Sequence, residues 1–466
     1  MKSMPLNNRT VNDFHKHKGV RTAAILTLGC KVNQYESEAL AEELRRLGIE
    51  VLTPDDVCDC YVINTCSVTA EADRKSRQAI RKLRRKNPEA IVIAAGCVAQ
   101  REPEALSAIP GVDYVIGNEA KVRDAVAAVM AGRPGDGLPV VLSRDLSSAP
   151  FERIATSAFP RTRRYIKIED GCENRCAYCA IPDARGSIRS KPREDIVSEV
   201  RAHIEAGCRE IVLTGIETAS YGKDTGDDLV SLLSALDSVC PEGSCRFRLS
   251  SLSPLLFTPG FIRGITGIKS RAHHFHISIQ SGSDAVLRRM RRGYGRDDVY
   301  GAIERLRSVF PDMMFTTDII AGFPGETEED FADTVRLICD NRFLMTHIFP
   351  YSEREGTPAA RMEGRLSEEV KRERASILAF EAGRTSRRLL ADYVSRRPGE
   401  VLLVESAEDG MLTGHTGNFI SVRLPDPGSG IKRGDFIGVR LTGAEGSGRI
   451  CSAVPDEEQT IARQIQ

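Results

Sequence analysis

Short apolar runs alternate with longer stretches of helical character over about the first 145 residues of the chain. The runs are Ala23–Leu28, Tyr61–Asn64, Ile91–Ala95 and Val112–Ile116. This rhythm is typical of βαβ units and predicts a parallel sheet. The segment Gly132–Pro150 is rich in Gly, Pro and Ser, so it predicts a linker after which a second domain begins.

A second alternating section extends from about residue 160 to residue 350. Six strands are expected there, which are fewer than the eight of a closed TIM barrel. The pattern therefore predicts an open, partial (βα)6 TIM-like barrel with its site at the carboxyl ends of the strands. The expected strands are Arg164–Ile168, Glu210–Thr214, Cys245–Ser251, His274–Ile279, Met314–Ile320 and Phe343–Phe349.

The pattern changes after a charged, helical stretch over Ser367–Ser395. Short strands with Gly-rich turns follow, and they predict a small antiparallel β-barrel. These strands are Val401–Glu405, Leu412–His415, Phe419–Leu424, Asp435–Leu441 and Arg449–Val454. The expected fold class is α/β with three domains, over residues 20–145, 155–390 and 393–455.

Composition narrows the class of protein only a little. Hydrophobic residues make up 41% and charged residues 28% of the 466 positions, which is typical of a globular enzyme. Lys plus Arg equals Asp plus Glu, at 65 each, so net charge favours no class of partner. No apolar run approaches the roughly 18 residues of a membrane helix, and the first residues lack the apolar core of a signal peptide. A cytoplasmic protein without membrane contact is expected.

Thirteen cysteines are too many for core packing alone, and a reducing compartment disfavours disulfides. The segment GCENRCAYC places Cys172, Cys176 and Cys179 in a C-x3-C-x2-C spacing, on a loop after the first strand of the second domain. Three thiolates this close can hold three irons of a 4Fe-4S cluster and leave the fourth open. A three-thiolate zinc site is the alternative, but histidines at ligand spacing are missing nearby.

A second set of cysteines follows three predicted strands of the first domain. Cys30, Cys66 and Cys97 come after successive strands, and parallel strands end at one edge of a sheet. We therefore expect them to converge on a second cluster with an open iron. The remaining cysteines are expected to be ordinary thiols, with Cys58 and Cys60 at the opposite edge and Cys208, Cys240, Cys245, Cys339 and Cys451 scattered along the chain. His274 and His276 share one face of a strand, where packing or hydrogen bonding is favoured over metal ligation.

The C-x3-C-x2-C motif resembles that of the radical S-adenosylmethionine superfamily. In that superfamily the methionine part of S-adenosylmethionine chelates the open iron, and an electron from the cluster cleaves the sulfonium bond to give a 5′-deoxyadenosyl radical. The resemblance implies that further residues bind this cofactor: Tyr178 beside the adenine, Gly215 and Glu217 at the methionine end, Ser278 and Gln280 toward the ribose, and Ile320 and Gly322 at the adenine. The alternatives are a surface aromatic for Tyr178, a plain turn for the residues around Gly215 and a helix start for FPGE.

Longer segments resemble one family of that superfamily, the methylthiotransferases. TLGCKVNQYESEAL, NTCSVT and GCVAQ resemble its N-terminal cluster domain, GCENRCAYCAIPDARGSIRS its radical motif, and the C-terminal barrel its RNA-binding TRAM domain. The resemblance covers residues from about 20 to 455. It implies two 4Fe-4S clusters and the insertion of a methylthio group into an unactivated C–H bond. One S-adenosylmethionine would methylate sulfur held at the Cys30, Cys66 and Cys97 cluster, and a second would yield the radical.

Four segments resemble the family branch that acts on adenine C2 of threonylcarbamoyladenosine next to the tRNA anticodon. They are KVNQYESEAL, CSVTAEADRKSRQAIRK, LTGIETASYG and FPYSEREGTPAA. The alternatives are the isopentenyladenosine branch, the ribosomal-aspartate branch and, from another class, a non-catalytic iron-sulfur RNA-binding protein. The expected partners are a tRNA anticodon stem-loop and an electron donor such as flavodoxin or ferredoxin.

Basic residues gather at places that fit RNA phosphates. Arg74–Lys86 holds eight basic residues in thirteen. Two further groups are Arg288, Arg289, Arg291 and Arg292, and Arg423, Lys432, Arg433 and Arg440 of the small barrel. A solvated helix face is the alternative for the first two groups. Arg185 and Arg189, in ARGSIRS, are expected to contact a charged base substituent, with a structural salt bridge as the alternative.

Overall fold

The computed structural model describes residues 19–135, 137–157, 162–396, 399–428, 430–445 and 450–456. They divide into two compact units: the first holds the described residues up to Thr156 together with Asp183–Arg185, and the second holds the other described residues. The expectation of no signal peptide concerns residues 1–18, which lie outside the described residues. Among the helices that are described, none combines the length and the apolar character needed to cross a membrane.

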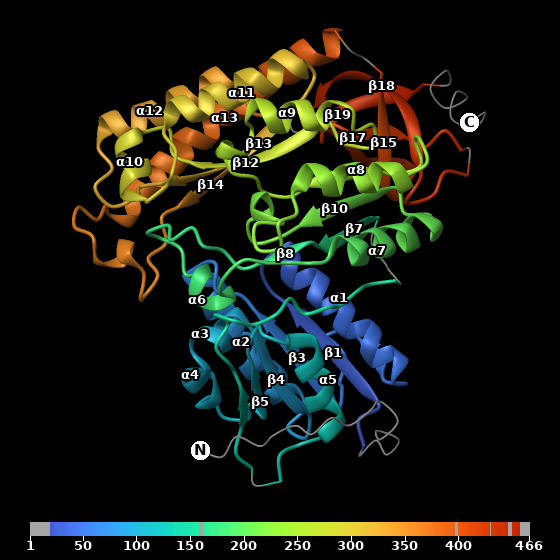
Figure 1. Cartoon of the computed structure of the whole chain (residues 1–466), viewed down its shortest axis with the longest axis vertical. Helices are drawn as coiled ribbons and strands as arrows, with labels where there is room; N and C mark the ends of the chain where they lie inside the picture. The colour runs from blue at the N-terminus through green and yellow to red at the C-terminus, as the bar shows by residue number, and fades with distance from the viewer. Residues whose placement is uncertain are drawn as a thin grey trace. The chain divides into compact units, whose positions relative to one another are not determined.

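The N-terminal unit is built on a sheet of six parallel strands in the order β2-β1-β3-β4-β5-β6. Alternate side chains of the sheet face two separate hydrophobic cores. Helices α1 and α5 cover one face, and α2, α3 and α4 supply the core of the other (Figure 1). The elements are β1 (Thr22–Thr27), α1 (Lys31–Arg46), β2 (Glu50–Leu52), β3 (Cys60–Thr65), α2 (Ala70–Lys86), β4 (Ile91–Gly96), α3 (Cys97–Arg101), α4 (Pro103–Ser107), β5 (Tyr114–Ile116), α5 (Lys121–Ala131) and β6 (Val140–Leu142).

Two strands of this sheet were not predicted. β2 is an edge strand of three residues, and β6 lies inside Gly132–Pro150, where the sequence predicts a linker. The linker prediction is wrong at Val140–Leu142, which pair in parallel with β5. A run of three apolar residues between Gly- and Pro-rich turns is too short for periodicity to reveal, and its strand state depends on the neighbouring strand.

The second unit begins with the predicted partial barrel. Two three-stranded parallel sheets, β11-β10-β7 and β12-β13-β14, are linked by single parallel bridges such as Leu252 to Ile277. In the described residues no ladder joins the end strands β7 and β14, so the six-stranded barrel is open, as predicted. The strands are β7 (Arg163–Lys167), β10 (Glu210–Thr214), β11 (Arg246–Leu249), β12 (His274–Gln280), β13 (Met314–Ala321) and β14 (Met345–Pro350).

Helices and two short strands connect the barrel strands. Helices α7 to α9, α11 and α12 pack their apolar faces on the strands and form one large core with them (Figure 1). These elements are β8 (Glu169–Asp170), α6 (Ile181–Arg185), β9 (Arg189–Ser190), α7 (Arg193–Glu205), η2 (Thr218–Ser220), α8 (Leu229–Val239), η3 (Pro254–Leu256), α9 (Pro259–Thr266), α10 (Asp284–Arg289), α11 (Arg296–Val309), α12 (Glu328–Asn341), η4 (Pro358–Arg361) and α13 (Glu368–Arg396).

A closed barrel of five strands ends the chain, in the order β15-β16-β17-β19-β18. The prediction of a small antiparallel barrel is confirmed, except that β17 and β19 pair in parallel. The strands are β15 (Gly399–Glu408), β16 (Met411–Thr416), β17 (Ser421–Pro425), β18 (Phe436–Glu445) and β19 (Ile450–Pro455). Arg449, the first residue of the last predicted strand, lies outside the described residues.

A buried carboxylate lies where the small barrel packs on the six-stranded one. Glu210 of β10 is fully buried and pairs with Arg163, Arg246 and Arg248. Burial alone would raise the pKa of Glu210, but the three guanidinium groups hold it well below its ordinary value. Arg246 also donates to the carbonyl oxygens of Val401 (3.1 Å) and His415 (2.9 Å) of the small barrel. The same arginine therefore binds the carboxylate and the neighbouring barrel.

We predict that Glu210→Gln lowers the free energy of unfolding by about 3–5 kcal/mol, because three buried guanidinium groups lose their shared anion. Glu242→Gln is the matched control, since Glu242 forms an exposed ion pair with Lys269 and such pairs contribute at most about 1 kcal/mol. Urea unfolding of both variants, followed by circular dichroism, measures the difference. Equal unfolding midpoints for the two variants would contradict the prediction.

Candidate functional site

Three thiols of the N-terminal unit lie together at the carboxyl edge of its sheet. Cys66 and Cys97 directly follow the adjacent strands β3 and β4, and Cys30 caps helix α1 after β1. Burial, with a smaller contribution from the neighbouring thiols of the set, raises the pKa of Cys30 and raises that of Cys66 to about 12. Val68 N–H donates to Sγ of Cys66 (3.4 Å), and the side-chain amide of Asn118 to Sγ of Cys97 (3.6 Å).

The turn before Cys30 leaves room for the thiol of Cys66. Gly29 has a φ of +94°, and a Cβ at this position would lie 2.5 Å from Sγ of Cys66. Only glycine combines this backbone conformation with the close approach of another side chain. The LTLGC segment therefore places the thiols against one another.

The side chain of Asn33 holds the ends of two strands together. Its amide nitrogen donates to the carbonyl oxygens of Leu28 (2.8 Å) and Thr65 (3.0 Å), which follow β1 and end β3. Asn64 in turn donates to the backbone oxygen of Asn33 (3.0 Å) and to the hydroxyl of Ser37 (2.9 Å). Because all of these groups are buried or half-buried, the network fixes the loops that carry Cys30 and Cys66.

Arg185 is fully buried beside these thiols, within the N-terminal unit. Its guanidinium forms a two-pronged pair with Glu36 (2.7 and 3.1 Å), and Lys121 pairs with the same carboxylate. The positive charge of Arg185 lowers the pKa of Cys30 and Cys66 against the larger effect of burial. These contacts favour the structural salt bridge over the substrate contact for Arg185.

Arg189 is also buried, in the second unit. It lies opposite Asp170 in the β8–β9 pair, its guanidinium is 3.5 Å from that carboxylate, and it donates to the carbonyl oxygen of Ser187 (3.3 Å). Here too the contacts favour the structural alternative.

The thiols of Cys172, Cys176 and Cys179 gather on the loop that follows β8. Burial, with smaller contributions from the nearby Glu217, Cys179 and Cys176, raises the pKa of Cys172 to about 12. Backbone hydrogen bonds fold the loop, among them one from Cys179 N–H to the carbonyl oxygen of Cys176 (3.1 Å). The structure thus brings the three thiols of this motif together.

Two of these sulfur atoms accept hydrogen bonds. Arg292 donates to Sγ of Cys176 (3.1 Å), and Ile181 N–H lies 3.4 Å from Sγ of Cys179. Clustered thiolates, burial and N–H groups that point at sulfur are features of iron-sulfur ligation. The donor sets of both units fit a 4Fe-4S cluster that is held by three cysteines.

Tyr178 packs into the barrel instead of standing alone on the surface. Its ring lies edge-on to that of Phe323, at 6.4 Å between centroids, and Phe323 in turn contacts Tyr351 at 5.3 Å. Ile320 contacts the same apolar cluster. Burial raises the pKa of the Tyr178 hydroxyl, which lies 3.4 Å from Arg292. Tyr178 and Ile320 therefore border one apolar surface next to the cysteine loop.

Gly215 and Glu217 follow strand β10, next to the same loop. A Cβ on Gly215 would lie 2.4 Å from Oε2 of Glu169, which accepts a hydrogen bond from Glu217 N–H (2.9 Å). The amide of Asn174, on the cysteine loop, lies 3.4 Å from the Glu217 carboxylate. Burial raises the pKa of Glu217. The carboxylate is thus held between β10 and the cysteines.

The remaining predicted cofactor residues end strands β12 and β13. Ser278 and Gln280 lie at the end of β12, where the pairing with β13 becomes irregular after Ile277 and Gln280 takes a φ of +77°. Ile320 is in β13, and Gly322 follows it. All of them lie at the carboxyl edge of the barrel, where the sequence predicts the site.

Arg292 is a site residue that the sequence assigned to an RNA-binding patch. It is half-buried, donates to the carbonyl oxygen of Ser278 (3.1 Å) and contacts the Tyr294 hydroxyl (2.9 Å). Arg289 of the same patch pairs with Asp330 (2.9 Å). A run of arginines carries no signal for which of them is buried, so the sequence could not separate Arg292 from its neighbours.

Two family models match the chain. Residues 22–117 match the model described as uncharacterized protein family UPF0004, and residues 166–338 match the radical SAM superfamily. A threonylcarbamoyladenosine tRNA methylthiotransferase of Bacillus subtilis is 40% identical, over 86% of this chain and 90% of its own length. The Thermotoga maritima protein of that name is 38% identical, over 95% of this chain and 100% of its own length. The chain belongs to the radical S-adenosylmethionine methylthiotransferase family.

Other comparisons agree with this assignment. Relatives named tRNA-2-methylthio-N6-dimethylallyladenosine synthase are 34–36% identical to this methylthiotransferase. A solved radical S-adenosylmethionine methyltransferase from Kitasatospora setae shares the fold, with a TM-score of 0.53 and 16% identity over 73% of this chain and 77% of that one. The methylthiotransferase is therefore a radical enzyme, whose cofactors are S-adenosylmethionine and 4Fe-4S clusters.

Three other cysteines of the methylthiotransferase, predicted to be scattered thiols, form a group. The thiols of Cys208 and Cys240 lie near that of Cys245, and the sulfur of Cys240 donates to the carbonyl oxygen of Cys245 (3.4 Å). The neighbouring Cys245 lowers the pKa of the half-buried Cys240 to about 7. Cys339 is also half-buried, but burial raises its pKa. Cys240 is therefore the more reactive thiol near neutral pH.

We predict that iodoacetamide alkylates Cys240 of the holoenzyme well before Cys339, the matched control. Because the thiolate is the nucleophile, the rate at Cys240 should rise from pH 6 to pH 8 and level off above its pKa of about 7. Peptide mass mapping after timed alkylation measures both rates. Equal rates at pH 7 would show that the contact with Cys245 does not activate Cys240.

Proposed function

We propose that this enzyme adds a methylthio group to C2 of N6-threonylcarbamoyladenosine next to the tRNA anticodon. The supporting observation is the identity of 40% and 38%, over 86% and 95% of the chain, with two relatives named for that activity. Relatives named for dimethylallyladenosine, an adenosine that carries the isopentenyl substituent, are 34–36% identical over 76–83% of the chain. The same chemistry on isopentenyladenosine is therefore the second candidate.

We assign the radical cluster to Cys172, Cys176 and Cys179. When bound, this cluster and S-adenosylmethionine supply the one-electron chemistry that breaks an unactivated C–H bond. Arg292 donates a hydrogen bond from its guanidinium to the sulfur of Cys176, and such bonds to sulfur are typical of cluster ligands. The buried carboxylate of Glu217, beside Cys172, suits the ammonium group of the methionine part.

The apolar surface of Tyr178, Phe323 and Ile320 suits the adenine ring. Ser278 and Gln280 would meet the ribose. These assignments place one side of the cofactor against β10 and the other against β12 and β13. An electron donor such as flavodoxin or ferredoxin would reduce the cluster.

We assign the auxiliary cluster to Cys30, Cys66 and Cys97. Arg185 holds a positive charge near these sulfur atoms, and Glu36 keeps that charge in place. Positive charge beside a cluster stabilises its reduced form and so raises its reduction potential. The role of Arg185 is then to position and tune the sulfur ligands.

Exposed basic side chains support RNA as the partner. Helix α2 carries Arg74, Lys75, Arg81, Lys82 and Arg85 on its exposed face. Several cations in a row suit the phosphates of a tRNA stem, and such binding weakens steeply with salt. A tRNA substrate would place the enzyme in the cytoplasm.

The small barrel adds a second basic surface. Arg423, Lys432, Arg433 and Arg440 are all exposed there. Phosphate and shape recognition fits this surface better than base stacking, because aromatic residues make up 6% of the chain and none is Trp.

We predict that two triple variants separate the two clusters. Alanine at Cys172, Cys176 and Cys179 should remove about four irons per chain and all cleavage of S-adenosylmethionine. Alanine at Cys30, Cys66 and Cys97 should also remove about four irons, yet leave cleavage intact while no methylthiolated product forms. Iron and sulfide analysis and chromatography of 5′-deoxyadenosine measure these outcomes.

Cys339→Ala is the control and should keep the full iron content, since Cys339 lies on helix α12, outside both sets. A first variant that still releases 5′-deoxyadenosine, or a second that keeps all its iron and sulfide, would refute the corresponding ligand assignment.

We predict a specific change in tRNA nucleosides. Deletion of the gene should remove the 2-methylthio derivative of threonylcarbamoyladenosine and leave its unmodified precursor in its place. Mass analysis of digested tRNA from the deletion strain, with a plasmid-complemented strain as control, measures both nucleosides. Loss of the isopentenyl analogue, with the threonylcarbamoyl product retained, would assign the substrate to the other branch.

A further inference from the structure

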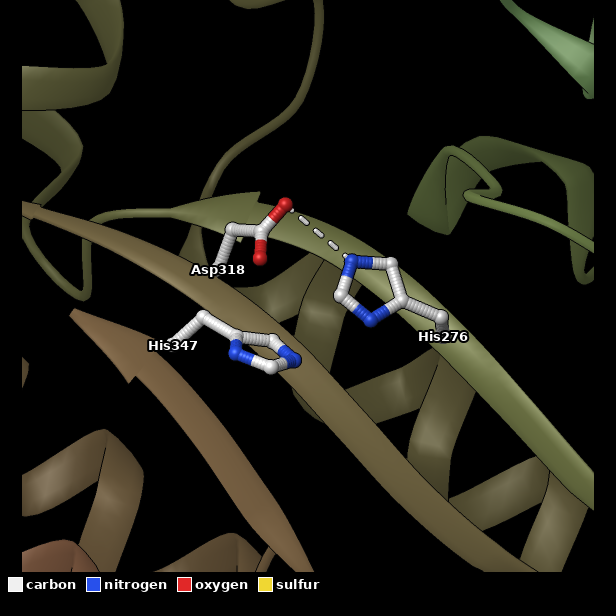
Figure 2. Close-up of side chains that lie close together, drawn as sticks. All are labelled: His276, Asp318 and His347. Carbon is white, nitrogen blue, oxygen red and sulfur yellow. Dashed lines mark hydrogen bonds and ion pairs between the residues drawn. The ribbon is translucent and has the colours of Figure 1, made fainter. Parts of the chain in front are cut away.

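Two histidines and an aspartate from three neighbouring strands lie together in the partial barrel. His276 of β12, Asp318 of β13 and His347 of β14 point toward one another (Figure 2). One ligand atom of each residue lies within 4.8 Å of those of the other two. Asp318 and His347 are opposite each other in the parallel register of β13 and β14. The arrangement therefore follows from the sheet and does not depend on a loop.

Hydrogen bonds fix the ring of His276. Its Nδ1 lies 2.9 Å from the hydroxyl of Thr316, and its Nε2 lies 3.1 Å from Oδ2 of Asp318 (Figure 2). Thr316 is buried and also contacts Nε2 of His274 (2.9 Å). Histidine ligands of metals are commonly held in this way, with one ring nitrogen on a protein partner and the other on the metal. A bound cation would replace the proton between Nε2 and the carboxylate.

The spacing suits a metal ion. Zinc binds histidine nitrogen and carboxylate oxygen at about 2.0–2.1 Å, which puts tetrahedral ligand atoms about 3.3 Å apart. The 3.1 Å between His276 and Asp318 already matches this spacing. His347 is exposed, so its side chain can rotate and bring a ring nitrogen within bonding distance of a metal ion held by the other two residues. Two imidazoles and one carboxylate are a set that zinc and iron(II) bind.

We propose that His276, Asp318 and His347 bind one divalent metal ion of the zinc or iron(II) class, separate from the cluster cysteines. Three protein ligands leave a position open for water or a carboxylate oxygen. His276 and Asp318 lie two residues before Ser278 and Ile320 on the same strands. The ion would thus lie beside the proposed cofactor surface, and its binding does not depend on which nucleoside is the substrate.

Titration of the holoenzyme with zinc tests the proposal. The reconstituted enzyme, with both clusters present and loose metal removed on a chelating resin, is titrated anaerobically with ZnCl2 in a calorimeter. One zinc ion per chain should bind, and His347→Gln and Asp318→Asn should each weaken binding at least about tenfold. His273→Gln is the matched control, since His273 is an exposed histidine outside the group, and it should leave binding unchanged.

X-ray absorption at the zinc edge identifies the ligands. The proposal requires a shell of nitrogen and oxygen at about 2.0–2.1 Å and no sulfur at about 2.3 Å. A sulfur shell would place the zinc on cysteines and overturn the proposal. No stoichiometric binding, or equal binding by all three variants, would also overturn it and leave His276 and Asp318 as a hydrogen-bonded pair. The exposed side chain of His347 keeps the test valid if Asp318→Asn fails to fold.

Discussion

The parallel register of β1, β3 and β4 is the constraint on which the N-terminal site depends. Thr27 lies opposite Asn64 in one pair of strands, and Thr65 lies opposite Gly96 in the next. The residues that follow these strand ends therefore arrive at one edge, although long helical crossovers separate them in sequence. A shift of one residue in either pair would turn the side chains to the other face of the sheet. Burial of both faces under helices prevents that shift, so the two hydrophobic cores also determine where the thiols lie.

Two buried glutamates, Glu36 and Glu210, organise the polar interior of the two units, each with more than one cation. Burying paired charges costs desolvation energy, so such groups are weak evidence for stability by themselves. The two glutamates instead matter because each one positions arginine side chains. Glu36 holds Arg185 near the thiols of Cys30 and Cys66, whereas Glu210 holds two arginines that also bind backbone oxygens of the small barrel. In both cases the carboxylate fixes the position of a cation that interacts with a neighbouring part of the chain.

The sequence predicts the parts of this molecule that depend on local pattern and on strand topology. Cys172, Cys176 and Cys179 are neighbours in sequence, whereas Cys30, Cys66 and Cys97 follow three strand ends that the parallel arrangement brings together. The strand Val140–Leu142 could not be predicted, because so short a strand forms only by pairing with a neighbouring strand, here β5. Arg292 was misplaced because burial is decided by packing, which a run of arginines does not reveal. His276, Asp318 and His347 come from three strands, one residue each, with no motif to connect them, so only the register of the sheet brings them together.

The small barrel is joined to the six-stranded barrel by a shared core, and this affects how RNA contacts can be tested. Met314 and Leu344, at the start of β13 and just before β14, pack with Leu390 and Tyr393 of helix α13 against the apolar interior of the small barrel. Removal of the small barrel would expose these side chains and leave the arginines around Glu210 without their backbone acceptors. Such a truncation would disturb the fold along with any RNA contact. Exposed cations such as those of β17 and β18 are outside this core, so replacing their charges changes the surface while the shared core stays intact.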